Sequence, residues 1–512
     1  MRKFGACWNR AVFFAIFLAV FILAAATGVR AGGKAEESSD YGKYAAAAGL
    51  LLPPEQVNIE SIVASVDYYY PYPEKPVGAQ LFAGNRQIPA TGQTELLHIG
   101  IQGQAVPFEE LNPMDLVLVV DTGGTMAGED KLSWVKESLL ALTERVRMDD
   151  RVAIITAGEK PALLFPLQPV GAAGGGTEIS SIISGLEAGG DSDSGPAADI
   201  GAALDFAYHV PGAESIGATS RERTRRIILL SDGRSLTEET VNRSVEWADE
   251  KGVAVTTVGY GVDYNLELMR ELGLESGGTA RFITGKEDIQ EHFNDELDRM
   301  VYPVAKDVRL ELTLASGLRL EKSWGFDHEI APGSLRFTID TLHNRDYETI
   351  LAEVRIPSAN YTGRRLIASL SGTYRDRGGR EISLEKEELH VTFIEDSPGV
   401  VGYSDPVVLR SGSALHYAKT LEEIGRAYHG TETKSRKFLE GLIDIAQETR
   451  NQLENARMRL QDTVFDDFIN LLDNYIATLG KDAGLSESEI ETVRNSTEIV
   501  PGESDKGLTG QI

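Results

Sequence analysis

Residues 116–125 read Leu116-Val-Leu-Val-Val120-Asp121-Thr-Gly-Gly-Thr125, an apolar run that ends in an acidic, glycine-rich turn. A short continuous apolar run is typical of a strand buried on both faces of a parallel sheet. Apolar residues spaced three and four apart follow the turn, which predicts an amphipathic helix from about Leu132 to Val146. The stretch therefore predicts a strand–turn–helix unit with Asp121 at the end of the strand.

The same pattern returns farther along the chain, where Ile227-Ile-Leu-Leu230 ends in Ser231-Asp232-Gly233. Other apolar runs, separated by helical patterns, predict strands at 152–156, 253–258 and 280–283. This alternation across 104–302 predicts an α/β, doubly wound, mostly parallel sheet of the Rossmann-like kind. Ligands of such sheets bind at the carboxyl ends of the strands. We therefore expect Asp121 and Asp232 to meet at one rim.

The rest of the chain divides into segments of different periodicity. Apolar and polar residues alternate in 303–400, which predicts an antiparallel β domain, and 401–480 is helical in pattern. A segment at 32–103 precedes the α/β domain, and the polar residues 481–512 predict a flexible tail. One stripe at helical spacing comprises Leu453, Ala456, Leu460, Val464, Phe468, Leu471, Tyr475 and Leu479.

Residues 1–31 have the composition of a secretion signal. Arg2, Lys3 and Arg10 precede or flank the uncharged apolar run, and Val29-Arg-Ala31 places small residues where a signal peptidase cleaves. The pattern predicts export to the periplasm or the cell exterior, with cleavage after Ala31. The alternative is an uncleaved anchor at residues 11–29 that tethers the protein to the inner membrane.

The charge and the motifs exclude several function classes. Lys and Arg number 50 against 78 Asp and Glu, a formal net charge of −28, which disfavours binding to phosphate backbones and anionic membranes. We therefore expect no nucleic-acid partner, and membrane association only through an uncleaved leader. The sequence has no phosphate-binding loop, no His-Glu-x-x-His pair and no Gly-x-Ser-x-Gly elbow, so we do not expect an enzyme.

Asp121-Thr-Gly-Gly-Thr125 and Ser231-Asp232-Gly233 resemble the von Willebrand factor type A (VWA) domain. The chain is more narrowly similar to the bacterial exported branch described as calcium-activated chloride channel homologues. Residues 41–73, the strand at 96–103 and residues 305–308 resemble the segments that flank the A domain in that branch. The resemblance implies the doubly wound fold and a binding function.

The resemblance also implies a degenerate metal-ion-dependent adhesion site. The pattern in this family is Asp-x-Ser-x-Ser, a distant Thr and a later Asp, oxygen ligands that suit Mg²⁺ or Ca²⁺. Asp121, Thr125 and Asp232 match three of these positions, whereas Gly123 replaces the first Ser and Ala198 replaces the distant Thr. We expect no certain cofactor and at most a weakly bound cation. Candidate substitute ligands from the enlarged preceding loop are Ser192, Asp193 and Ser194.

Two functions follow from the resemblance. The first is a non-enzymatic interaction or adhesion module that docks another protein or an envelope component. The second is an assembly or maturation factor that works with a MoxR-type AAA ATPase or an envelope complex, for which the stripe in 453–479 would be the docking surface. The alternative for that stripe is a helix packed on its own domain. The pattern leaves the oligomeric state open.

Overall fold

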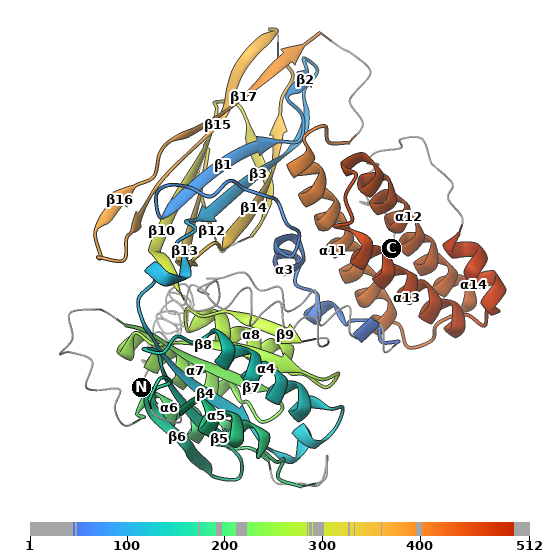
Figure 1. Cartoon of the computed structure of the whole chain (residues 1–512). Helices are drawn as coiled ribbons and strands as arrows, with labels where there is room; N and C mark the ends of the chain where they lie inside the picture. Colours follow the sequence, from blue (N-terminus) through green and yellow to red (C-terminus); the bar gives the residue numbers. More distant parts are fainter. Residues whose placement is uncertain are drawn as a thin grey trace, which may run out of the picture.

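The computed structural model describes residues 45–495, except 47–48, 173–174, 191–196, 211–222, 284, 286–288, 290–301, 326–327, 332, 360 and 396–401. These residues form three regions (Figure 1): a domain with a mostly parallel sheet, a β sandwich and a group of helices beside the sandwich. The predicted leader at 1–31 lies outside the described residues. No helix among the described residues is long and apolar enough to cross a membrane.

The first region, called the A domain below, has a six-stranded sheet in the order β6-β5-β4-β7-β8-β9. The strands are β4 (Met114–Asp121), β5 (Arg151–Ala157), β6 (Pro161–Pro169), β7 (Thr224–Ser231), β8 (Ala254–Tyr260) and β9 (Ala280–Ile283). All neighbouring strands pair in parallel except the edge strand β6, which pairs antiparallel with β5. The predicted α/β class and mostly parallel sheet are confirmed.

Helices cover both faces of this sheet, because successive side chains of a strand point to opposite faces. Leu116, Leu118 and Val120 of β4 share a core with α4 (Lys131–Arg145) and α5 (Gly175–Ser184). Val117 and Val119 share the other core. The helices of that second face are α6 (Ile200–Tyr208), α7 (Glu238–Lys251) and α8 (Leu266–Glu275).

The β sandwich is built from two separate parts of the chain. One sheet has the order β1-β3-β14-β11, with β1 (Val77–Ala83), β3 (Gln93–Gly103), β11 (Arg319–Trp324) and β14 (Tyr347–Ile356). The other runs β12-β13-β10-β15-β17-β2, with β16 beside β15. Its strands are β2 (Gln87–Pro89), β10 (Pro303–Leu314), β12 (His328–Ala331), β13 (Ser334–His343), β15 (Gly363–Arg375), β16 (Glu381–Ser383) and β17 (Glu387–Ile394). The sandwich thus draws on both the predicted 32–103 and 303–400 segments, and the A domain is inserted between them.

The third region consists of α11 (Pro406–Gly430), α12 (Arg436–Leu460), α13 (Asp466–Asp482) and α14 (Glu487–Arg494). A short N-terminal helix, α3 (Ile59–Ala64), shares their hydrophobic core. Seven residues of the predicted stripe lie on α12 and α13, and Val464 lies between these helices, in a break that begins at Gln461, a residue with left-handed backbone (φ +53°). Six of its eight residues, including Leu453 and Tyr475, are buried in that core. The stripe therefore packs on its own domain.

The predicted tail at 481–512 needs a correction. Residues 487–494 form α14, which starts with a capping box between Ser486 and Glu489, and Ile490 is buried against the other helices. One apolar residue and a reciprocal cap stabilise this turn although the surrounding composition is polar. Residues 496–512 lie outside the described part of the chain.

Candidate functional site

The two acidic strand ends lie side by side at one rim of the A-domain sheet. Strands β4 and β7 are parallel neighbours with Val120 opposite Leu230, so Asp121 ends β4 where Asp232 follows β7. Both carboxylates are completely buried. Asp121 Oδ2 accepts a hydrogen bond from Ser231 Oγ (2.6 Å), and Asp121 Oδ1 accepts one from the Gly123 amide (2.8 Å). The space around these groups is called the crevice below.

Burial raises the pKa of Asp121 to about 6, and the nearby charge of Asp232 adds to the rise. The hydrogen bonds from Ser231 and Gly123 and the charge of Lys131 act in the opposite direction. Burial is the larger effect because a carboxylate loses its hydration when it leaves water. Positive charge beside the crevice therefore favours the ionised form of Asp121.

Lys131, at the start of α4, supplies that charge. Its Nζ lies 3.0 Å from Asp232 Oδ2 in an ion pair, and only 3% of the Lys131 side chain is exposed. The same Nζ donates to the backbone oxygen of Thr125 (3.3 Å). The second carboxylate oxygen of Asp232 accepts from the Arg234 amide (3.1 Å). The ammonium group thus bridges both predicted ligand segments from inside the protein.

The backbone around Lys131 is adapted to this position. A Cβ atom at Gly261, which has φ +89°, would lie 2.2 Å from Lys131 Cε, so only glycine leaves room for the lysine stem. Glu129 and Asp130, just before Lys131, both adopt left-handed backbone (φ +55° and +57°). Left-handed backbone costs a non-glycine residue about 1–2 kcal/mol and is found where the surrounding structure enforces it.

The two positions that lack ligand oxygens face each other. A Cβ atom at Gly123 would lie 3.2 Å from the Cβ of Ala198 and 3.0 Å from its backbone nitrogen. A serine at 123 would therefore crowd the start of α6. Thr125 is half-buried in a 3₁₀ turn, Gly124–Ala127, and its contact with Lys131 is through the carbonyl. Ser192, Asp193 and Ser194 lie outside the described residues.

This set of donors does not fit a divalent cation. Mg²⁺ requires near-octahedral oxygen coordination, and Gly123 and Ala198 contribute no side-chain oxygen. Asp232, one of the three matching residues, is already paired with an ammonium group whose charge repels a metal ion. The described residues contain no group of three or more His, Cys, Asp or Glu side chains arranged to hold a metal.

The sequence prediction missed Lys131 and the role of Ser231. A signal for Lys131 was present, because a lysine at the first position of a helix lies at the positive end of the helix dipole. In this structure the ion pair with Asp232 compensates for that unfavourable position. Ser231 stood next to Asp232 in the quoted motif, but only the strand register shows that its hydroxyl group meets Asp121.

Comparisons with known proteins agree with this fold. Residues 115–296 match the model of the von Willebrand factor type A domain. The uncharacterized protein YfbK of Escherichia coli K12 is 28% identical over 281 residues, which are 52% of this chain and 46% of YfbK. The uncharacterized protein sll0103 of Synechocystis is 26% identical over 222 residues, which are 43% of this chain and 49% of that protein. The chain spans about half the length of these curated relatives.

A solved structure gives the same result. The von Willebrand factor type A protein from Catenulispora acidiphila has a TM-score of 0.52 and 14% identity, and the match covers 78% of this chain and 89% of that chain. At this identity the likeness shows the fold alone.

Proposed function

We propose that this chain, a protein with a VWA domain of bacterial type, is an exported, non-enzymatic module that binds another protein at the crevice rim without a metal ion. The observation that carries the proposal is the pair of left-handed, exposed residues Glu129 and Asp130, which immediately precede Lys131 of the buried Lys131–Asp232 pair. Strained backbone that the fold maintains at an exposed rim is typical of binding sites.

The rim has a charge that defines the partner's chemistry. Three exposed carboxylates surround the crevice, those of Glu129, Asp130 and Asp263. Glu129 Oε2 accepts from the Val262 amide (3.0 Å), which fixes the rim loop, residues 127–130, to the loop after β8. Arg234 forms a half-exposed pair with Asp263 (3.6 Å). The rim therefore suits a partner with a basic surface patch.

The internal lysine changes how the domain would bind. A metal-dependent A domain keeps an open metal position for a carboxylate of its partner. In this chain the ammonium group is covalently attached and buried, so binding uses the rim and does not depend on dissolved cations. The alternative of an assembly or maturation factor with a MoxR-type ATPase stays a prediction, and six of the eight residues of the stripe that would serve it are buried.

A photo-crosslinking experiment tests the proposed function. A photoreactive residue at Ala127, which is exposed in the rim loop, is compared with one at Met148, which is 75% exposed before β5. We expect one defined protein adduct at 127, none at 148, and an unchanged yield in EDTA. The double variant Glu129→Gln, Asp130→Asn should keep the fold of the rim loop, because Asn tolerates left-handed backbone. It removes two negative charges from the rim and should therefore reduce the yield of the adduct roughly tenfold. Equal adducts at 127 and 148, or an adduct abolished by EDTA, would refute the proposal.

A further inference from the structure

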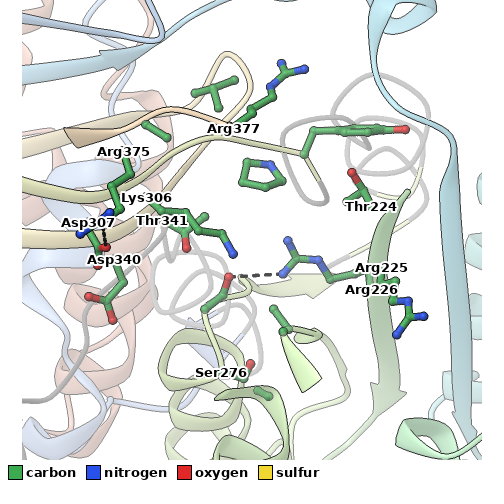
Figure 2. Close-up of a pocket in the computed structure, with 18 of the residues that line it drawn as sticks. Thr224, Arg225, Arg226, Ser276, Lys306, Asp307, Asp340, Thr341, Arg375 and Arg377 are labelled. Atoms are coloured by element: carbon green, nitrogen blue, oxygen red, sulfur yellow. Dashed lines mark hydrogen bonds and ion pairs between the residues drawn. The ribbon is translucent and has the colours of Figure 1, made fainter. Parts of the chain in front are cut away.

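A cleft with a volume of about 520 Å³ lies between the A domain and the sandwich (Figure 2). The A domain contributes the first residues of β7 and β8 and the end of α8, and the sandwich contributes β10, β13 and the turn after β15. These are the amino ends of β7 and β8, opposite the crevice. The volume is in the range of pockets that bind small molecules, about 300–1,000 Å³.

Arg226 forms the floor of this cleft and is only 3% exposed. Its guanidinium donates to the Gly277 carbonyl (3.3 Å) and lies 3.0 Å from His343 Nε2. Burial lowers the pKa of Arg226 to about 10, so the group remains a cation at neutral pH. Burial lowers the pKa of His343 well below its usual value, and the charges of Arg226, Arg281 and Lys306 lower it further. His343 is therefore neutral and adds no negative charge.

A second cation reaches the same space from the sandwich. Lys306 lies on β10, and Figure 2 shows its side chain extending toward the guanidinium of Arg226. Arg377, in the turn between β15 and β16, lies at another margin of the cleft. Arg377 is exposed, and partial desolvation lowers the pKa of its guanidinium. Thr224 and Thr341 also line the cleft, and Figure 2 shows Thr341 beside Lys306 and Thr224 on the opposite side.

Five acidic residues also line the cleft: Asp249, Glu275, Asp307, Asp340 and Asp376. Asp307 is paired with Arg375 (2.9 Å), and Figure 2 shows both beside Asp340, on the side of the cleft away from Arg226. Asp376 is paired with Arg380 (2.7 Å). Asp249 and Glu275 are contributed by the A domain. The space between Arg226 and Lys306 therefore presents guanidinium and ammonium donors, in a chain whose net charge is −28.

We propose that this cleft binds a phosphate group, carried by a small phosphomonoester that fills the remaining volume. A tetrahedral oxyanion accepts several charge-assisted hydrogen bonds at once, and converging Arg and Lys donors provide them. The anion also screens the repulsion between Arg226 and Lys306. Because the donors come from both domains, the ligand fixes the A domain relative to the sandwich. This site is independent of the proposed partner surface.

Isothermal titration of the full chain tests the proposal with three probes: inorganic phosphate, glucose 6-phosphate and glucose. We expect both phosphate-bearing probes to bind, more weakly as NaCl increases, and glucose not to bind. Tighter binding of the ester than of phosphate assigns the remaining volume to its organic part, whereas equal binding limits the site to the phosphate group and overturns the ester proposal. The whole proposal is overturned if neither phosphate probe binds at about 10 mM, or if glucose binds as tightly as glucose 6-phosphate.

Two variants locate the binding. Lys306 is exposed, so Lys306→Gln should fold normally and weaken phosphate binding roughly tenfold by removing one charge-assisted bond. The matched control is Lys322→Gln, an exposed lysine on β11 outside the cleft, which should bind as the wild type does. Equal affinities in the two variants would show that phosphate binds elsewhere and would refute the site.

Discussion

The two ends of the A-domain sheet hold charge in opposite ways. At the carboxyl ends of β4 and β7, two buried carboxylates are neutralised by Lys131, which belongs to the same domain and is closed off from water. At the amino ends, Arg226 of the A domain faces Lys306 of the sandwich across an open cleft. At the carboxyl ends, the negative and positive charges are balanced within the A domain. At the amino ends, two positive charges from different domains face each other. A ligand is therefore easier to explain at the second end than a metal at the first.

The largest expected effect tests the closed end. Lys131→Met leaves Asp232 buried without its counter-charge, and we expect the free energy of unfolding of the A domain to fall by about 3–5 kcal/mol. Lys306→Met at the open end removes an exposed lysine and should change it by less than about 0.5 kcal/mol. Urea unfolding followed by tryptophan fluorescence measures both.

The same variant shows whether Lys131 occupies a cation position. Millimolar Mg²⁺ should raise the Tm of Lys131→Met, because Asp121 and Asp232 then lack a cation, and should leave the Tm of the wild type unchanged. Equal losses of stability in Lys131→Met and Lys306→Met, or a wild type stabilised by Mg²⁺, would remove the contrast between the two ends.

The next effect depends on pH. The folded-state pKa of Asp121 is about 6, above its ordinary value of 3.8. Stability from the protonated form is thus complete below pH 3.8 and is lost as the pH rises through 6. Asp121→Asn should gain up to about 3 kcal/mol relative to the wild type between pH 4 and pH 7.5. Unfolding curves at the two pH values measure this gain, and parallel pH dependence of the two proteins would show that burial does not disfavour the ionised carboxylate.

The smallest effect concerns the glycine under the lysine stem. Gly261→Ala should cost about 2–3 kcal/mol through backbone strain and a clash with Lys131. Gly252→Ala has similar strain (φ +64°) with nothing within 4 Å, and should cost about 1 kcal/mol. If the clash with Lys131 causes the extra loss of stability at Gly261, then Gly261→Ala and Gly252→Ala should lower the free energy of unfolding equally in a Lys131→Ala background. A difference that persists there would assign the cost of Gly261→Ala to other neighbours.

The sequence predicted the parts of the fold that depend on local periodicity. The buried strands ending at Asp121 and Ser231 and the amphipathic helices between them are visible in the spacing of apolar residues. The sequence did not predict which distant segments pair, for example that β3 pairs with β14. Because a strand's partner depends on tertiary packing, strand patterns define a segment but not its neighbour.

The candidate site shows the same limit at the scale of side chains. Matching residues to a family pattern identified Asp121 and Asp232, and also the missing oxygens at Gly123 and Ala198. It could not identify Lys131, which corresponds to no position of that pattern and reaches Asp232 only because Gly261 leaves space. The family pattern could not predict the cleft either, because Arg226 and Lys306 belong to different domains.

Insertion of the A domain into the sandwich has a consequence for the order of folding. Gln102 of β3 pairs with Tyr347 of β14, so the ribosome must synthesise the whole insert before this pair of strands can form. The two junctions are adjacent, because a Cβ atom at Gly103 would lie 3.3 Å from a methyl group of Val304. A folded A domain therefore holds these strands together and removes an entropic cost on the order of 5 kcal/mol for closing the intervening loop. The insert acts as a clamp for its host, and mutations that unfold it should delay assembly of the sandwich.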